Sequence, residues 1–499
     1  MTIRLGEQPV TLDDVARVAR DGEAVEISPI VHGRLAAARA VVERLASAPE
    51  SIYGVNTALG ANTGLPLASD DLADYQRRAV RARAVAVGAP YDRQSVRAMM
   101  FARIAGMAAG GSGVSPHVFD ALVTLLNSDI VPVVPRIGSI SVADLAQLSH
   151  VALPLIGEGE AEFGGERLPG GEALRRAGLV PVTLDAKDGL ALISANAATV
   201  ARAALILHQL VRLLDDWLVA VALSFEGFRA NLSPLDPRAS GARPAPGQVE
   251  VAVRLRALLA GSALFAPGAA RRVQDPLSLR VVAQVHGAAR WMTRLASEQV
   301  ELELNSATES PLVVAADGVM ISNGNFYVPA LATALDAMSI ALAQAASLAV
   351  ERCIKFMSPA FTDLPLQLTR HGPAHSGFAT VQKTLTGLWA GIRHAANPGS
   401  LDFLPVSERT EDHATMALGV AEKLGDAIEK ARYLVAIELL IAAQAIDLRD
   451  LDRNRLGAGA RIAYERVRAA IPALDVDRPL GPDIDRIEAL VRAGDFNAP

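Results

Sequence analysis

Four apolar segments with helical spacing constrain what this chain can fold into. In residues 198–223 and 248–264, apolar side chains recur every three or four positions over much of the helical circumference. Two further apolar runs, 331–350 and 434–446, are interrupted by charged residues such as Asp336. A membrane span needs about 20 predominantly apolar residues, so we expect these runs to be helices of a buried bundle. The sequence therefore predicts a mainly α-helical protein.

Composition narrows the class of protein further. The 499 residues are 51% hydrophobic, enough for a large core, and only 4% are aromatic. The net charge of −6 arises from interspersed acidic and basic residues, which indicates neither a nucleic-acid nor a membrane partner. Cys353 is the single cysteine, so no internal disulfide can form, and because the N-terminal residues are polar we expect no signal peptide. We expect a cytoplasmic protein.

Short motifs rich in glycine, asparagine and charged residues separate the predicted helices, and such loops commonly carry function. They are Tyr53-Gly-Val-Asn-Thr57, Gly138-Ser-Ile-Ser-Val-Ala-Asp144, Gly157-Glu-Gly159, Gln274-Asp-Pro-Leu-Ser-Leu-Arg280, Asn323-Gly-Asn-Phe326 and Glu411-Asp-His413. Together these motifs resemble the active-site segments of the aromatic amino-acid ammonia-lyases and aminomutases, the superfamily of histidine, phenylalanine and tyrosine ammonia-lyases. The resemblance extends from about Val10 to Phe496.

The resemblance implies an architecture and an assembly. The expected ammonia-lyase-like fold has an N-terminal globular region, residues 1–196, on a long central helical bundle with C-terminal helices, residues 197–499. The family forms homotetramers whose active sites lie where several subunits meet. Tyr53 and Arg280 would then act on one small-molecule substrate from different chains.

One family feature is altered in this chain. In the family, an Ala-Ser-Gly tripeptide cyclises to the electrophile methylidene-imidazolone, and the central serine loses its hydroxyl. Aligned on Asp144, the three positions hold Ser141, Val142 and Ala143. Val142 has no hydroxyl to lose, and β-branched residues follow both Ser139 and Ser141, which crowds the attacking nitrogen. We therefore expect no methylidene-imidazolone and no other cofactor.

The resemblance also implies the site residues. Tyr53 stands at the position of the catalytic base, Arg280 at that of the arginine that pairs with the substrate carboxylate, and Glu411 at that of the active-site acid. Arg83 replaces a family histidine, and a cation there suits an anionic or polar substrate group. The remaining expected substrate-binding residues are Asn196, Leu277 in place of a tyrosine, Asn325, Phe326 and His375.

A metal site is not expected. His371 and His375 have the spacing of one helical turn, but Gly372-Pro373 between them breaks a helix.

These observations lead to three hypotheses about function. The first is an enzyme, lyase-like or an isomerase or cyclase, that works without methylidene-imidazolone. Its tyrosine would transfer a proton during elimination, addition, isomerisation or cyclisation of a carboxylate- or carbonyl-bearing molecule. The second is a non-catalytic ligand-binding or scaffold protein. The third is a histidine- or tyrosine-type ammonia-lyase with an atypical electrophile.

Overall fold

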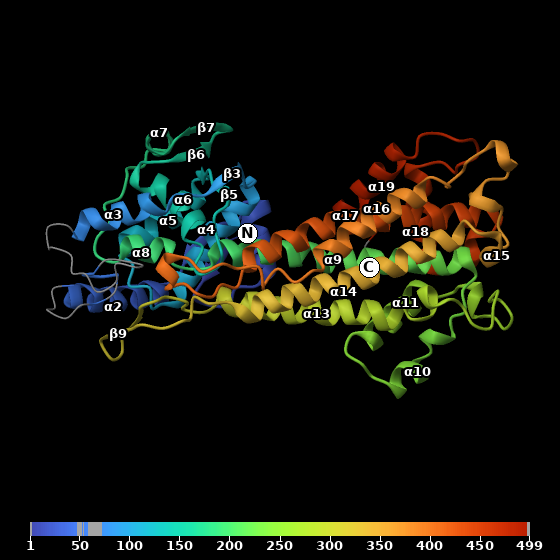
Figure 1. Cartoon of the computed structure of the whole chain (residues 1–499), viewed down its shortest axis with the longest axis horizontal. Coiled ribbons are helices and arrows are strands. Elements are labelled where there is room, and N and C mark those ends of the chain that lie inside the picture. The colour runs from blue at the N-terminus through green and yellow to red at the C-terminus, as the bar shows by residue number, and fades with distance from the viewer. Residues whose placement is uncertain (1, 47–51, 53, 58–71, 497–499) are drawn as a thin grey trace. The chain divides into compact units, whose positions relative to one another are not determined.

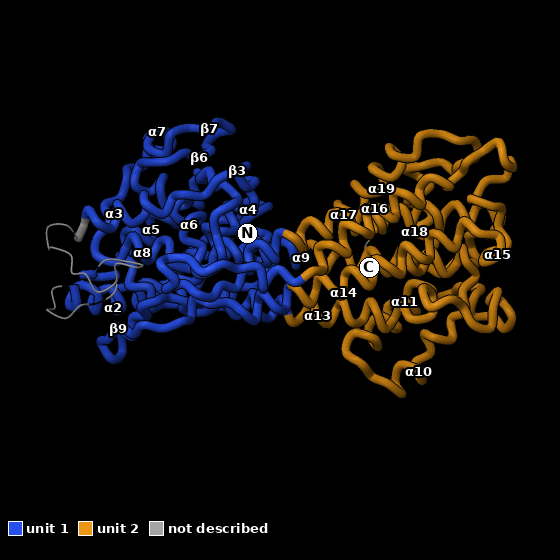
Figure 2. The backbone as a smooth tube through the Cα atoms, viewed as in Figure 1, with its two compact units in different colours: residues 1–208, 296–335, 398–422 blue, residues 209–295, 336–397, 423–499 orange. Residues whose placement is uncertain are grey.

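A computed structural model describes residues 2–46, 52, 54–57 and 72–496, and these residues are mainly helical (Figure 1). The mainly α-helical prediction is confirmed. The chain divides into two compact units, each assembled from three separate stretches of sequence (Figure 2). Unit 1 comprises residues 1–208, 296–335 and 398–422, and unit 2 comprises residues 209–295, 336–397 and 423–499. The domain boundary expected between residues 196 and 197 stays a prediction.

Unit 1 combines short helices with small sheets. Strands β1 and β2 are parallel, β3 pairs with β5, β4, β6 and β7 form a three-stranded antiparallel sheet, and β8 pairs with β9. Helix α4 is buried along almost its whole length and begins after Asp92, whose carboxylate caps the Ser95 amide. The strands are Thr2–Leu5 (β1), Ala24–Ile27 (β2), Val87–Pro90 (β3), Val131–Pro132 (β4), Pro135–Ile137 (β5), Glu160–Phe163 (β6), Glu166–Pro169 (β7), Leu312–Val314 (β8) and Val319–Ile321 (β9). The helices are Leu12–Ala16 (α1), Pro29–Ala46 (α2), Leu72–Arg83 (α3), Arg93–Ala109 (α4), Pro116–Asn127 (α5), Leu145–Ala152 (α6), Gly170–Arg176 (α7) and Asp188–Ile193 (α8).

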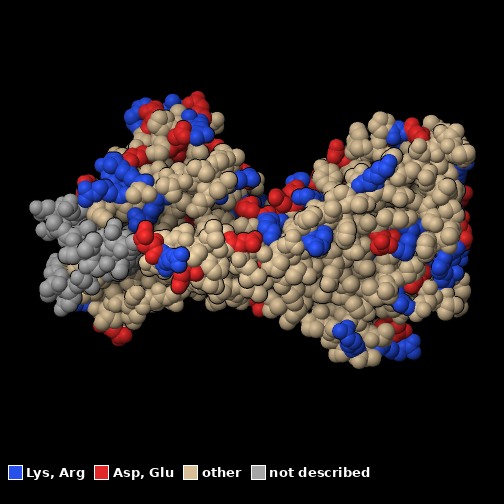
Figure 3. Space-filling view, viewed as in Figure 1, with Lys and Arg blue, Asp and Glu red and all other residues tan. Residues whose placement is uncertain are grey.

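Arginine side chains gather on α3, as Figure 3 shows. Two of them, Arg77 and Arg81, bind the Glu158 carboxylate, each at 2.6 Å. Because α3 and Glu158 are far apart in sequence, these ion pairs join two segments of unit 1.

Four long helices contribute residues to both units. They are α9 (Ala197–Phe228), α13 (Val282–Leu304), α14 (Pro329–Phe356) and α17 (Ala417–Leu448). Three of them contain the apolar segments 198–223, 331–350 and 434–446, so the helices expected there are confirmed. The fourth segment, 248–264, ends earlier than expected. Its helix stops at Leu258, and Gly261 adopts a left-handed φ of 82° that a continuing helix cannot contain.

Unit 2 is built almost entirely of helices around the shared ones. Its other α-helices are Pro237–Ala242 (α10), Gln248–Leu258 (α11), Leu277–Arg280 (α12), Pro359–Thr362 (α15), Val381–Ala395 (α16), Ala458–Ala470 (α18) and Gly481–Ala493 (α19). Single turns of tighter helix connect them, among them Ala263–Phe265 and Arg453–Arg455.

A fully buried ion pair lies in the core of unit 2. The Arg352 guanidinium binds the Glu438 carboxylate through two hydrogen bonds of 2.7 and 3.0 Å, and both side chains are 0% exposed. Glu438 also accepts hydrogen bonds from Trp217 and Ser224, and Arg352 donates to the Ser278 carbonyl. Every charge in this network therefore has a partner, as burial of charge requires.

Cys353 follows Arg352 in α14 and is fully buried. Burial raises the pKa of its thiol well above the ordinary range.

Two stretches of helix are long and apolar enough to cross a membrane, Asp188–Phe228 and Pro329–Phe356. In their most apolar windows, 94% and 61% of the residues are buried within the protein. Burial of this extent fits core helices, as the sequence predicts, and gives no clear membrane signal.

Asp216 in α9 is a buried carboxylate, and neither of its oxygens has a hydrogen-bond partner among the described residues. Burial, and next the charge of Asp215, raise its pKa to about 7, with Asp495 adding to the rise and Arg212 and Arg466 opposing it. The unfolded chain has an Asp pKa of about 3.9. The folded state therefore binds the proton more tightly, and stability falls as the pH rises from about 4 through 7.

Replacing Asp216 with asparagine is expected to remove this fall. The variant should be more stable than the parent by about 4 kcal/mol at pH 8, and the two should have similar stability at pH 4. Urea unfolding across this pH range measures the difference. Asp426→Asn, an exposed change in α17, is the matched control, and parallel pH profiles of Asp216→Asn and the parent would contradict the assignment.

Candidate active site

The segment 139–144 forms a tight turn in unit 1. Ser141 and Ala143 have left-handed φ angles of 58° and 55°, which cost non-glycine residues free energy and persist only where the surroundings enforce them. The Ser141 hydroxyl accepts a hydrogen bond from the Leu418 amide at 2.8 Å and lies 3.1 Å from the Thr199 hydroxyl. The Thr415 hydroxyl donates to the Ser141 carbonyl at 3.2 Å. Contacts from distant parts of the sequence thus hold the turn.

The Asp144 carboxylate stabilises this turn through three hydrogen bonds. It is fully buried and accepts hydrogen bonds from the Ser139 hydroxyl at 2.6 Å, the Thr199 amide at 2.7 Å and the Thr199 hydroxyl at 3.0 Å. Burial raises the pKa of Asp144, and these hydrogen bonds act in the opposite direction. Its own amide donates to the Ala195 carbonyl, so the turn is anchored beside Asn196.

Asp144→Asn tests this anchoring. The asparagine keeps the shape of the side chain but presents an NH₂ group where a carboxylate oxygen accepted, so one buried donor loses its partner. We expect a loss of about 1–3 kcal/mol in the free energy of unfolding, measured with urea. The exposed change Asp402→Asn should leave stability unchanged. An equal effect of both variants would mean that Asp144 does not anchor the turn.

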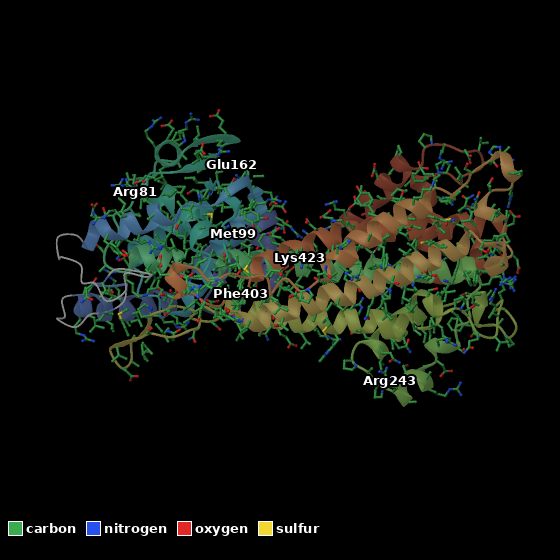
Figure 4. The ribbon with its side chains drawn as sticks, in the orientation of Figure 1. Arg81, Met99, Glu162, Arg243, Phe403 and Lys423 are labelled. Carbon is green, nitrogen blue, oxygen red and sulfur yellow. The ribbon has the colours of Figure 1, made fainter. Side chains whose placement is uncertain are left out.

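Val142, at the tip of the turn, pairs with Tyr327 through an isolated antiparallel bridge. The two residues are half-buried. The Tyr327 hydroxyl is hydrogen-bonded to Nδ1 of His413, and burial followed by the charge of Asp412 raises the pKa of Tyr327. The His413 ring lies 4.8 Å from that of Phe403, which is labelled in Figure 4. An acid–base pair with an aromatic neighbour therefore adjoins the turn.

Asn196 and Phe326, two residues expected to bind substrate, are in contact with each other. The Asn196 amide group donates to the Phe326 carbonyl. Its own side-chain oxygen is buried without a hydrogen-bond partner among the described residues. A buried acceptor left unpaired is costly, so this oxygen is available to a donor on a bound molecule.

The other expected site residues of unit 1 are less closely tied to the turn. Glu411 is half-buried, and its backbone pairs with Val406. Asn325 is exposed, and its amide donates to the Asn323 side chain. Arg83 donates to the Ala79 carbonyl within its own helix, α3, at 3.1 Å, and no contact joins it to the turn. Tyr53 lies outside the described residues.

Unit 2 holds Leu277, Arg280 and His375. Leu277 is 56% exposed at the start of α12, and Arg280 is half-buried at its end. The ring of His375 packs at 4.8 Å from that of His371, which contacts the Asp475 carboxylate at 2.8 Å.

The Tyr327–His413 pair is the part of the site that sequence reasoning missed. These residues are 86 positions apart. The sequence signal available was the tyrosine itself, which stands after Asn325-Phe326 where the family has histidine.

One group of side chains in unit 1 could offer ligand atoms to a metal ion. Atoms of His117, Asp185 and Asp188 lie within 4.8 Å of one another. However, Asp188 accepts hydrogen bonds from the Ser115 amide and hydroxyl, and the Arg39 guanidinium lies 3.4 Å from it. Because these partners already compensate the carboxylate, we assign no metal to this group.

An Ala-Ser-Gly tripeptide occurs once in the chain, at Ala239–Gly241, far from the turn in sequence. It lies within α10 of unit 2, where Ser240 is buried and its hydroxyl contacts the Asp236 and Pro237 carbonyls.

Comparisons with known proteins show that the chain is similar to aromatic amino acid lyases. The model of the family described as aromatic amino acid lyase matches residues 10–469. The chain is 39% identical to a histidine ammonia-lyase of Symbiobacterium thermophilum over 98% of its own length and 96% of that enzyme's. Among solved structures, histidine ammonia-lyase from Trypanosoma cruzi superposes with a TM-score of 0.90 at 31% identity, covering 99% of this chain and 94% of that one.

A second solved structure aligns with this chain over the full length of both proteins. It is the ergothioneine-degrading enzyme ergothionase from Treponema denticola in complex with desmethyl-ergothioneine sulfonic acid, with a TM-score of 0.96 and 30% identity. The ammonia-lyase-like fold expected from the motifs is therefore confirmed.

These relatives correct two expectations. The expected enzyme working without methylidene-imidazolone, in a reaction of its own, is contradicted by full-length similarity to several histidine ammonia-lyases. The expected absence of a prosthetic group conflicts with the family, which uses methylidene-imidazolone. The error came from weighing three residues, Ser141–Ala143, above the rest of the chain.

The residues of the turn 139–144 still lack the central serine from which methylidene-imidazolone forms. Val142 has no hydroxyl, and the Ser141 hydroxyl is bound by the Leu418 amide. We therefore assign no step of the reaction to the group.

Proposed function

Because the chain belongs to the aromatic amino acid lyase family and is therefore a lyase, we propose that it releases ammonia from histidine or a closely related imidazole-bearing amino acid. The observation that carries the proposal is the 39% identity to histidine ammonia-lyase over 98% of the chain. The third hypothesis from the sequence is thus preferred to the other two.

In this reaction a proton leaves the β-carbon, and the bond between the α-carbon and nitrogen breaks. The electron pair of the C–H bond forms the α,β double bond, and the pair of the C–N bond departs with the amine. The product is an α,β-unsaturated acid with the imidazole ring in conjugation.

Each residue of the expected site has a role in this proposal. Tyr53 accepts the β-proton, and Arg280 and Arg83 bind the carboxylate through charge-assisted hydrogen bonds. Glu411 holds the ammonium or the ring nitrogen. The remaining residues proposed to contact the ring or the turn are Asn196, Leu277, Asn325, Phe326, His375, Tyr327 and His413.

The Tyr327–His413 pair supports an imidazole-bearing substrate. Its hydrogen bond joins a phenol to an imidazole, two groups that can each donate or accept. A substrate imidazole also has one donor and one acceptor nitrogen when neutral, so either end of the pair can match it. His413 is exposed and Tyr327, which pairs with Val142, is half-buried, so the pair is accessible from solvent.

We further propose that the enzyme is a cytoplasmic homotetramer. Tyr53 and Arg280 then act on one substrate from different subunits, as the family arrangement implies. Size-exclusion chromatography with light scattering measures the assembly.

The direct test supplies L-histidine to the purified full-length protein. Ammonia and an ultraviolet-absorbing conjugated acid should form in equal amounts, and phenylalanine and tyrosine should react far more slowly. Intact mass recorded on the same sample reports whether the chain has lost two water molecules. Absence of turnover of any imidazole-bearing amino acid would reject the proposal.

A second candidate substrate is ergothioneine, the trimethylammonium betaine of a thiol-bearing histidine. The ergothionase structure, whose bound ligand is a relative of that molecule, favours this candidate because it covers both chains completely. The leaving group distinguishes the candidates. Ergothioneine would release trimethylamine, and histidine would release ammonia.

A further inference from the structure

A cavity of about 690 Å³ opens in unit 2, where α9 and α17 end and the single turns Ala263–Phe265 and Arg453–Arg455 follow. All of its lining residues belong to unit 2. Its volume falls in the range of small-molecule sites, roughly 300–1,000 Å³. None of the residues assigned to the proposed reaction lines it.

Three arginines line this cavity, Arg229, Arg449 and Arg455. None of them forms an ion pair with any residue in the described part of the chain. Arg229 donates only to the Ala269 carbonyl, at 3.1 and 3.3 Å. Arg455 is exposed, and its side chain has no hydrogen bond with a described residue. Three cationic side chains thus line one cavity without a direct ion pair to a described residue.

Four acidic residues line the same cavity, and the hydrogen bonds that each accepts come from groups other than these three arginines. Asp363 is held by Arg271 through two hydrogen bonds of 2.5 Å. Asp450 is bound by Arg370 at 3.1 Å, and Asp452 accepts from the Asn454 amide at 3.0 Å. Glu226 is 3% exposed and accepts from the Gly457 amide at 2.8 Å.

The arginines also repel one another. Burial and then the charges of Arg229 and Arg271 lower the pKa of Arg449 to about 10, with Asp363 opposing them. Capping explains part of the arrangement, because Arg449 Nε donates to the Gly227 carbonyl in the last turn of α9 at 2.7 Å. It does not explain Arg455.

The backbone of Arg229 provides a further observation. Arg229 directly follows α9 and has a left-handed φ of 60°, with the Ala230 amide bonded to the Phe225 carbonyl. Glycine is the usual residue at such a position because it has no Cβ. The chain instead places a guanidinium there, on the wall of the cavity.

We propose that this cavity binds a small polyanion, a molecule with two or more phosphate or carboxylate groups, through Arg229, Arg449 and Arg455. Guanidinium groups bind phosphate and carboxylate oxygens in a bidentate fork, which favours anions of this class. A polyanion can bind three guanidinium groups that have no direct ion pair, and the cavity has room for more than a single phosphate. The site lies apart from the residues of the proposed reaction, so the two proposals fail or stand separately.

Isothermal titration calorimetry on the full-length protein tests the site, with inorganic pyrophosphate and citrate as probes. We expect saturable binding of at least one probe, and the tighter of the two identifies phosphate or carboxylate as the natural group. Arg455→Gln should weaken that binding about tenfold or more, because it removes one charge-assisted contact. Arg229→Gln should act in the same direction.

Arg486→Gln is the matched control, since Arg486 is exposed on α19 of the same unit and does not line the cavity. It should bind the probe as the parent does. The Arg455 side chain makes no hydrogen bond with a described residue, so its variant is expected to fold even if Arg229→Gln does not. Absence of saturable binding at millimolar probe, or equal binding by Arg455→Gln and the parent, would overturn the proposal.

Discussion

Replacing Arg352 with methionine is expected to destabilise the protein by about 3–5 kcal/mol. The change leaves the Glu438 carboxylate fully buried with no cation beside it, and it frees the Ser278 carbonyl. The cost is that of an uncompensated charge in a low-dielectric interior, which far exceeds the lost attraction of an exposed pair. Urea unfolding followed by circular dichroism measures the change.

A double variant separates the charge from the packing. Arg352→Met combined with Glu438→Gln removes both charges and keeps an acceptor for the Trp217 N–H group, so most of the lost stability should return. The neighbouring exposed change Glu351→Gln should cost less than 1 kcal/mol, as exposed ion pairs usually do. If Arg352→Met proves as mild as Glu351→Gln, the charge is not buried in solution.

Tyr53→Phe is expected to lower kcat for ammonia release by about 10²–10⁴-fold, the usual contribution of a positioned acid or base. The ring remains to fill its space, so KM should change little. Steady-state kinetics with L-histidine measures the effect.

Tyr433→Phe serves as the control because Tyr433 lies in α17 of unit 2, outside the proposed site. Its kcat should equal that of the parent. A Tyr53→Phe enzyme with full kcat would remove Tyr53 from the reaction while leaving the substrate assignment open to direct measurement.

The long helices were predictable from the sequence because their evidence is local and repetitive. Apolar residues at helical spacing over 198–223 and 331–350 correspond to α9 and α14. The premature end of α11 was missed because the apolar pattern continues past Leu258, whereas the backbone turns at Gly261. One left-handed residue overrides a continuing pattern.

For the site, motif positions predicted single residues and not their contacts. Asn196 and Phe326 were each expected to bind substrate, which stays a prediction, and the hydrogen bond between them was not expected. The Tyr327–His413 pair depends on two loops meeting in three dimensions, for which one sequence contains no spacing rule. The reaction was misjudged because ring-closure chemistry at Val142 was allowed to outweigh similarity along the whole chain.

The burial of Cys353 has a practical consequence. The chain has no other cysteine, and this thiol is both inaccessible and disfavoured as the reactive thiolate. A cysteine introduced at an exposed position, such as Val180 or Leu404, would therefore be the only site to react with a maleimide reagent. Fluorophores or spin labels can then be attached one at a time without first removing a native residue.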